Sequence, residues 1–165
     1  MSDCCAQAKG ASCSRPESKP GVCPRCNTKG KPVATVTVKN LVRDHTRVPA
    51  TMTFSFCRTP DCEAVYFSEQ AMFEKSDLKI RIGIKEKEDP IPVCYCFDYT
   101  RADIYQEIEK FGKTEIPERI KAEVQAGFCA CEVKNPAGKC CLGNVSEVIQ
   151  DRVRDMNERN TASSR

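Results

Sequence analysis

The chain has 165 residues, of which 13 are cysteine and none is tryptophan, and its formal net charge is +3. Mean hydropathy is −0.49, and no stretch approaches the roughly 18 consecutive apolar residues that a membrane-spanning helix needs. The first ten residues contain no apolar leader segment, so we expect a cytoplasmic protein with no membrane insertion. A charge this small does not by itself indicate a polyanionic partner.

Residues 1–21 are rich in Ala, Gly, Ser, Pro and Lys without an apolar period, and we expect a flexible arm that carries Cys4, Cys5 and Cys13. Residues 22–90 are expected to form a β-rich domain. Strands are predicted at 33–38, 52–56, 64–67 and 78–84, and the last of these alternates most regularly. The run of charge and proline at 85–92 then indicates a domain boundary.

Residues 91–157 are expected to form a small all-helical domain, followed by a frayed tail at 158–165. The first helix begins at Thr100, where Asp103 completes the pattern of a capping box, and it ends at Gly112.

Pro117 suits the first turn of a second helix, which ends before Gly127, and a third helix is predicted at about 142–156. The predicted inner faces consist of Ile104, Ile108 and Phe111, then Ile120 and Val124, then Val145, Val148, Ile149 and Val153.

The cysteines occur in close groups, which favours metal binding over a disulfide framework in a chain without a leader segment. Cys23 and Cys26 have the spacing of a zinc knuckle, and Cys57 and Cys62 form a slightly longer version of the same turn. Two such turns joined by a hairpin supply four thiolates for a tetrahedral structural Zn²⁺ site. His45, the only histidine, is an alternative ligand, although a loop position is favoured for it. Nearby cations that can offset the charge of this site are Lys29, Lys31 and Arg58.

The second group has a different spacing. Cys94 and Cys96 form a C-x-C pair that precedes a predicted helix, and this arrangement suits a cluster in which one cysteine pair binds one iron and another pair the second. A second zinc site is the alternative. The helices expected after Cys96 and after Cys141 would direct N–H groups and positive dipole ends toward a negative cluster, which favours Cys141 over Cys140 as a ligand. The side chains expected to shield this site from water are Val93, Tyr95 and Phe97.

Four segments together resemble the N-terminal module of CopZ-type copper chaperones, whose second half is similar to bacterioferritin-associated ferredoxins. These segments are residues 57–67, 81–86, 89–96 and 131–141, and the resemblance extends over about residues 23–143. The resemblance implies one zinc ion and one [2Fe–2S] cluster. It implies zinc ligands at Cys23, Cys26, Cys57 and Cys62. It implies cluster ligands at Cys94, Cys96, Cys131 and one of the adjacent pair Cys140 and Cys141, of which Cys141 is favoured.

The sequence departs from the pattern of these chaperones in two ways. No M-x-C-x-x-C loop of the kind found in their copper-binding domain follows residue 143, and Cys129 and the cysteines of the arm are additional.

We interpret the chain as an α+β metalloprotein, with a small zinc-stapled β-rich domain followed by a small all-helical [2Fe–2S] domain. The predicted function is electron transfer linked to the handling of copper or another metal ion, including reduction of Cu(II) to Cu(I). The thiolates of Cys4, Cys5 and Cys13 in the arm are expected to bind the Cu(I). The expected partners are metal ions and a redox or copper-handling protein. No Ser/His/Asp arrangement, phosphate loop or pair of acids indicates an enzyme.

The alternative is a zinc-ribbon module for nucleic-acid binding or regulation, because residues 23–50 hold six Lys or Arg residues and one acid. A solvated charged face is the favoured explanation of this excess, so we do not expect nucleic acid as a partner.

Overall fold

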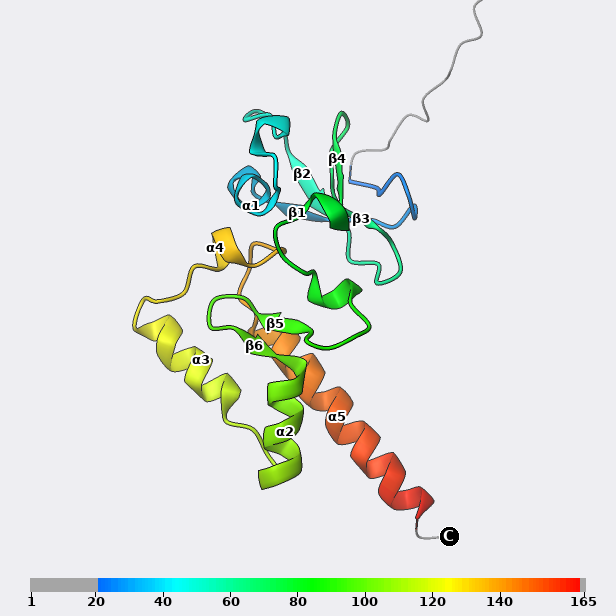
Figure 1. Cartoon of the computed structure of the whole chain (residues 1–165), viewed down its shortest axis with the longest axis vertical. Coiled ribbons are helices and arrows are strands. Elements are labelled where there is room, and N and C mark those ends of the chain that lie inside the picture. Colours follow the sequence, from blue (N-terminus) through cyan, green and yellow to red (C-terminus); the bar gives the residue numbers. More distant parts are fainter. Residues whose placement is uncertain (1–20, 164–165) are drawn as a thin grey trace, which may run out of the picture.

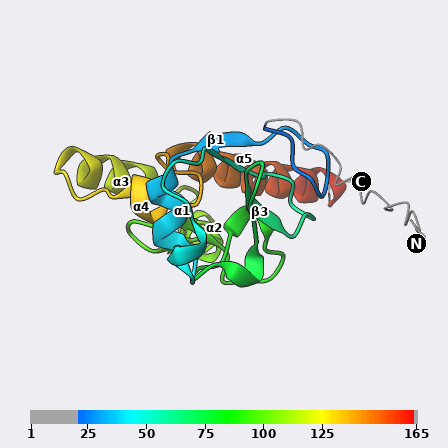
Figure 2. The same ribbon diagram turned by 90° about the horizontal axis from the view of Figure 1, so that it is seen from above.

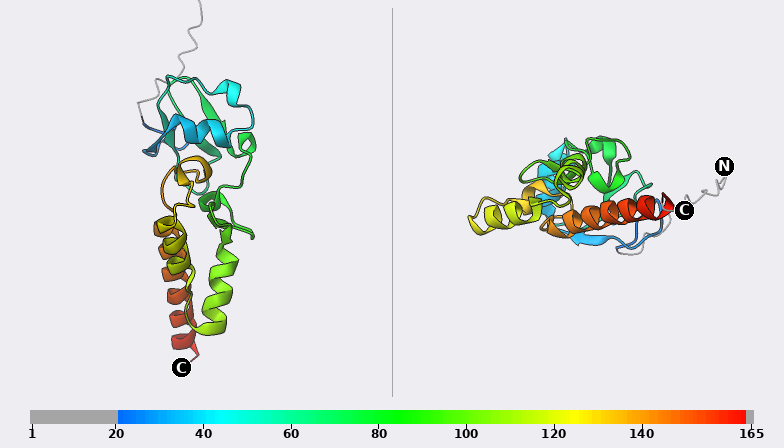
Figure 3. Two further views of the ribbon diagram at one scale, coloured as in Figure 1. Left: turned by 90° about the vertical axis from the view of Figure 1, so that its left-hand side faces the viewer. Right: turned by 90° about the horizontal axis from the view of Figure 1, so that it is seen from below.

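The structure is a computed structural model of the chain, and it describes residues 21–163. An antiparallel sheet occupies one end, a group of helices occupies the other, and a short hairpin lies between them (Figure 1). The long helix α5 (Leu142–Ala162) runs away from the sheet beside α2 (Arg101–Phe111), so the molecule is elongated (Figure 3). The predicted fold class is confirmed, since a β-rich part with a four-cysteine site precedes a largely helical part.

Four short strands form the sheet, and each pairs antiparallel with the next in chain order. They are β1 (Lys31–Val33), β2 (Phe54–Phe56), β3 (Ala64–Phe67) and β4 (Met72–Glu74). All of β3 is buried, because this strand lies between β2 and β4. The rings of Phe54 and Phe73 pack at 6.0 Å between centroids in the core of the sheet. The strands predicted at 52–56 and 64–67 are therefore confirmed, the first of them in a shorter form.

The strand predicted at 33–38 is wrong after its first residue, because Thr35–Leu41 form helix α1. A strand would place Val36 and Val38 on the same face. Instead, Val36 is 41% exposed and Val38 is fully buried. Leu41 is buried three residues further on, which is the spacing of one helical face. Burial in the tertiary core thus overrides an alternation that by itself favours a strand.

The strand predicted at 78–84 is also wrong, although Leu78 and Ile82 are buried in the core as that prediction required. One isolated bridge joins Leu78 to Val42, and the segment ends in a 3-10 turn at Gly83–Lys85. Within residues 21–163 no strand pairs with this segment. Its apolar and polar residues alternate as in a strand, but it has no hydrogen-bonded ladder to a neighbour.

The sequence predicted an all-helical region after residue 90, but this region also contains two strands. Strands β5 (Pro92–Cys94) and β6 (Tyr99–Thr100) form a hairpin that leads directly into α2. Strands of two and three residues are too short to produce a periodic signal in the sequence.

Capping signals located the three main helices correctly. The Thr100 hydroxyl accepts a hydrogen bond from the Asp103 N–H, and the Asp103 carboxylate accepts one from the Thr100 N–H. Gly112 ends this helix with a φ of 74°. Pro117 lies in the first turn of α3 (Ile116–Gln125). Helix α5 begins where predicted and continues to residue 162, and among the described residues no helix has the length and hydropathy of a membrane span.

Two predicted inner positions of these helices are wrong, since Phe111 is 64% exposed and Val153 is 43% exposed. Arg152 is buried instead, with its guanidinium 5.0 Å from the ring centroid of Tyr105 and paired with Glu109. The other predicted positions pack together in one apolar cluster, namely Ile104, Ile108, Ile120, Val124, Val145, Val148 and Ile149.

A short helix, α4 (Cys131–Lys134), packs against α1 in the N-terminal part of the molecule (Figure 2). The Thr37 hydroxyl donates a 2.6 Å hydrogen bond to the carbonyl of Glu132, and the Tyr66 hydroxyl donates a 2.7 Å bond to the carbonyl of Pro136. Thr37 and Tyr66 are both fully buried. The loop after Cys131 is therefore held on the core of the N-terminal sheet.

Candidate metal centres

Two loops at one end of the sheet bring four cysteines together. Cys23 and Cys26 lie in the turn before β1, where the Asn27 N–H donates a 2.9 Å hydrogen bond to the Cys23 carbonyl. Cys57 follows β2 directly, and Cys62 lies two residues before β3. The β1–β2 and β2–β3 pairings set these two loops side by side. The sheet register thus assembles ligands that are far apart in the sequence.

The four-thiol site, defined as Cys23, Cys26, Cys57 and Cys62, is compact. All four Sγ atoms lie within 4.8 Å of one another. The Sγ atoms of Cys23 and Cys62 are 3.9 Å apart, and those of Cys26 and Cys57 are 3.7 Å apart. Four converging thiols are the donor set of a closed structural zinc site. His45 is exposed in a separate 3-10 turn and does not belong to this group.

The four thiols differ in pKa because their surroundings differ. Burial raises the pKa of Cys62 to about 12 and also raises the pKa of Cys23. Cys26 is only half-buried, and although its partial burial raises its pKa, hydrogen bonds from Thr59 and Thr28 lower it to about 6. Burial of thiols without a cation disfavours the thiolate, so a bound divalent ion would supply the positive charge that this site lacks.

The second cysteine group, defined as Cys94, Cys96, Cys131 and Cys141, lies where the hairpin meets the two C-terminal helical segments. Cys94 ends β5 and Cys96 lies in the hairpin turn. Cys131 is the first residue of α4, and Cys141 is the N-cap of α5.

The closest thiols in this group belong to different segments. The Sγ atoms of Cys96 and Cys131 are 3.5 Å apart, and the Ala130 N–H donates a 3.3 Å hydrogen bond to the Cys96 Sγ. Cys94 and Cys141 are buried in the same cluster, where the interaction between their thiols lowers the pKa of Cys94 to about 6 and raises that of Cys141. We expected Cys94 and Cys96 to act as one ligand pair. The geometry instead favours pairs formed between segments, because the hairpin presents Cys96 to α4 and Cys94 to α5.

Burial separates the remaining thiols of this region from the second cysteine group. Cys94, Cys131 and Cys141 are buried and Cys96 is half-buried, whereas Cys129 and Cys140 are exposed. The Cys129 Sγ lies 3.8 Å from that of Cys131. The predicted arm cysteines, Cys4, Cys5 and Cys13, lie outside the described residues.

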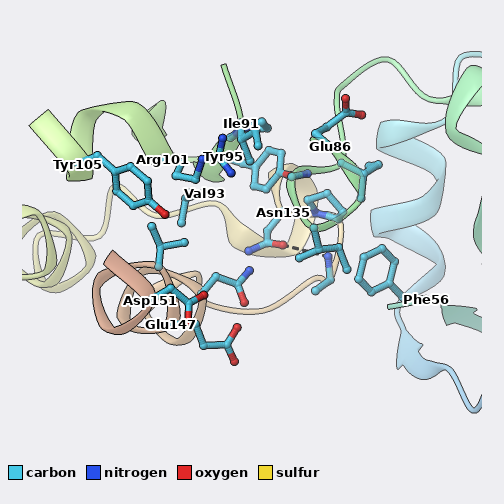
Figure 4. Close-up of a pocket in the computed structure, with 18 residues that line it drawn as sticks. Phe56, Glu86, Ile91, Val93, Tyr95, Arg101, Tyr105, Asn135, Glu147 and Asp151 are labelled. Carbon is cyan, nitrogen blue, oxygen red and sulfur yellow. Dashed lines mark hydrogen bonds between the residues drawn. The ribbon is translucent and has the colours of Figure 1, made fainter. Parts of the chain in front are cut away.

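Tyr95 does not serve as the predicted shield of this group. Its hydroxyl accepts a 2.8 Å hydrogen bond from the Gly83 N–H and donates one to the Arg81 carbonyl, so the side chain is directed toward residues 81–83 (Figure 4). Tyr95 lines a cavity of about 220 Å³ at the junction of the two halves, and no cysteine lines this cavity. Val93 and Phe97 do pack with the buried cysteines of the group, as predicted.

One buried residue beside the four-thiol site was not indicated by the sequence. The predicted neighbouring cations Lys29, Lys31 and Arg58 are all exposed. The buried cation is Lys85, whose ammonium donates hydrogen bonds to the carbonyls of Thr59 and Cys62. Lys85 stands in a run of charged residues that predicts a solvated linker, so no local signal distinguished it.

Comparison with known proteins relates the chain to one family. The profile of a CopZ zinc-binding domain matches residues 20–79. The copper chaperone CopZ of Archaeoglobus fulgidus is 41% identical over 119 residues, which are 72% of this chain and 57% of the chaperone. The X-ray structure of the A. fulgidus CopZ N-terminal domain aligns with a TM-score of 0.63 at 37% identity, over 77% of this chain and 96% of that domain. The chain thus spans little more than half the length of the chaperone.

Proposed function

This chain belongs to the family of the CopZ N-terminal domain, and from that premise we propose that it handles metal ions through two metal centres and transfers electrons to copper. One centre is a structural zinc ion and the other is a [2Fe–2S] cluster. The proposed zinc ligands are Cys23, Cys26, Cys57 and Cys62, and the proposed cluster ligands are Cys94, Cys96, Cys131 and Cys141.

The zinc assignment has two independent supports. The family profile that matches this part of the chain is that of a zinc-binding domain. The four thiols converge within 4.8 Å in a largely buried site, and zinc accepts four thiolates in a tetrahedral arrangement. A site closed by four protein ligands leaves no position for a substrate, so the zinc ion is proposed to stabilise the fold.

The single observation that carries the cluster assignment is the arrangement of the second cysteine group as two close thiol pairs. Cys96 lies against Cys131, and Cys94 lies against Cys141. A [2Fe–2S] cluster needs two thiolates for each of its irons. The hydrogen bond from the Ala130 N–H to the Cys96 Sγ stabilises a thiolate at this position, and such bonds tune the potential of iron–sulfur centres.

The proposed activity joins one-electron transfer to copper binding. When bound, the cluster supplies single electrons, and one electron converts Cu(II) to Cu(I). Cu(I) prefers soft thiolate ligands, so thiols near the site of reduction capture the product. Exposed Cys129 and Cys140 flank the second cysteine group, and Cys4, Cys5 and Cys13 precede the described residues. The related A. fulgidus protein is named a copper chaperone, which makes copper the metal of choice.

Anaerobically purified protein tests this proposal. The cluster predicts a red-brown solution with about two iron and two sulfide per chain. Protein reduced with dithionite and freed of the reductant is then mixed with one equivalent of Cu(II), and the visible spectrum and the bound Cu(I) are measured. We expect stoichiometric oxidation of the protein, with Cu(I) retained.

A triple Ser variant of Cys4, Cys5 and Cys13 serves as the matched control for capture. Weaker Cu(I) retention by this variant supports a role for the arm, and equal retention removes the arm from the proposal. A colourless protein that holds two zinc ions would contradict the cluster, and an unchanged spectrum after Cu(II) addition would contradict electron transfer to copper.

A further inference from the structure

Lys85 is a buried cation that the zinc and cluster assignments do not use. It ends the 3-10 turn at Gly83–Lys85, and it is only 3% exposed, although lysine is among the residues least often buried. Its Nζ donates hydrogen bonds of 2.7 Å to the Thr59 carbonyl and 2.9 Å to the Cys62 carbonyl. Both carbonyls belong to the loop that carries Cys57 and Cys62. Lys85 therefore reaches from the start of the charged run at 85–92 into one of the two cysteine loops of the four-thiol site.

The charge of Lys85 has no carboxylate partner in the described part of the chain, where no carboxylate oxygen lies within 4.0 Å of its Nζ. The nearby acids Glu63 and Glu86 are engaged by Lys75 at 3.9 and 3.8 Å, and Glu86 also pairs with Arg81 at 2.8 Å. Two carbonyl oxygens satisfy hydrogen bonds of the ammonium but do not neutralise its charge. Burial of an unpaired charge is strongly unfavourable, so a negative group is expected close to it.

The four-thiol site becomes that negative group when a divalent ion binds. Four thiolates carry four negative charges and the ion supplies two positive ones, so the occupied site keeps a net negative charge. Lys85 bonds to the backbone of the ligand Cys62 itself, which sets its ammonium beside this charge. The exposed cations predicted from the sequence act through solvent and contribute far less than a buried one.

We propose that Lys85 is the counter-ion of the four-thiol site and a positioning residue for its second cysteine loop, and that its charge raises the affinity of the site for a divalent ion bound by four thiolates. This inference rests on the zinc part of the proposed function. The same turn donates the Gly83 N–H to the Tyr95 hydroxyl, between Cys94 and Cys96. The turn that carries Lys85 thus contacts both the four-thiol site and the hairpin of the second cysteine group.

The test compares zinc affinity in the full-length chain by competition with a colour-forming zinc chelator. The zinc content of a Cys62→Ser variant is measured beside that of the wild type, and the difference is assigned to the four-thiol site. Lys85→Met removes the charge at similar length, and Lys85→Arg keeps the charge. We expect Lys85→Met to weaken zinc binding by about tenfold or more, equivalent to about 1.4 kcal/mol, with Lys85→Arg within about threefold of wild type. Cobalt in place of zinc reports the ligands, and we expect the tetrathiolate absorption bands to keep their shape in Lys85→Met.

The matched control is Lys75→Met, because Lys75 is a neighbouring cation that is partly exposed and paired with acids. We expect it to stay within about threefold of wild type, as exposed ion pairs contribute little. Wild-type affinity in Lys85→Met overturns the inference, as does equal weakening in Lys85→Met and Lys85→Arg, which would indicate a dependence on shape rather than on charge. Equal zinc contents of wild type and Cys62→Ser would overturn the zinc assignment and this inference together.

Discussion

Cys140 and Cys141 are adjacent in the sequence, yet the fold treats them differently. Cys141 is 1% exposed at the N-cap of α5 and interacts with the Cys94 thiol, whereas Cys140 is exposed. Cys129 is likewise exposed, although it lies two residues from the buried Cys131. At the scale of single residues, burial therefore separates Cys141 from Cys140 and Cys131 from Cys129, although their side chains are chemically identical.

Serine variants test this separation. We expect Cys141→Ser to lose visible absorbance and iron, because serine removes one of the soft thiolate ligands that the cluster requires. Cys140→Ser and Cys129→Ser are the matched controls, and both are expected to keep the iron content of the wild type. If Cys140→Ser bleaches the protein and Cys141→Ser does not, the order is reversed, and bleaching by Cys129→Ser would shift the ligand assignment toward that residue.

At the scale of elements, helix boundaries follow local chemistry. Helix α2 begins at the reciprocal hydrogen bonds of Thr100 and Asp103 and ends at Gly112. This helix packs on α5 and directly follows the hairpin that carries Cys94 and Cys96. Its first turn therefore helps to hold the hairpin in place.

Removal of the cap tests the contribution of this boundary. We expect Thr100→Ala to lower the free energy of unfolding by about 1 kcal/mol, because the Asp103 N–H loses its acceptor and the first turn frays. Thr100→Ser keeps the hydroxyl and is expected to retain most of the stability. Urea denaturation followed by circular dichroism measures both, and equal midpoints for Thr100→Ala and Thr100→Ser would contradict a capping role.

At the scale of the whole molecule, contacts from both halves meet at the second cysteine group. Fully buried Thr37 and Tyr66, from the N-terminal sheet region, bind the backbone of the loop between Cys131 and Cys141. The Tyr95 hydroxyl, from the hairpin that carries Cys94 and Cys96, binds the backbone of Arg81 and Gly83. The four-thiol site stabilises the region from which most of these contacts come, so we expect the two centres to depend on each other.

Zinc removal tests this dependence. A structural zinc site contributes on the order of 10 kcal/mol to folding, so Cys62→Ser is expected to unfold the sheet region. Because the loop of Cys131 rests on that region, we also expect this variant to retain less iron than the wild type. The amide spectrum and the iron content measure the two effects. A metal-free chain with a native, well-dispersed amide spectrum would contradict the structural role, and full iron retention in Cys62→Ser would show that the centres are independent.

Features that depend on short stretches of chain could be predicted from the sequence. Cysteine spacing identified the knuckles that form the four-thiol site, and the pattern around Thr100 and Gly112 identified α2. The resemblance to a known family likewise depended on local motifs, and the comparisons bear it out. Such signals are readable because a turn, a cap or a ligand pair is specified by residues only a few positions apart.

Features that depend on which distant residues share a core became evident only in the folded molecule. The alternation at 33–38 and 78–84 fits strands, but one segment became a helix and the other lacks a partner strand. The same holds for Lys85, which a charged run predicts to be solvated and which the fold instead buries against the backbone of Cys62. The pairing of Cys96 with Cys131 is also a matter of long-range packing. Burial is a property of the assembled molecule, and no local pattern encodes which face of a short segment the rest of the chain will cover.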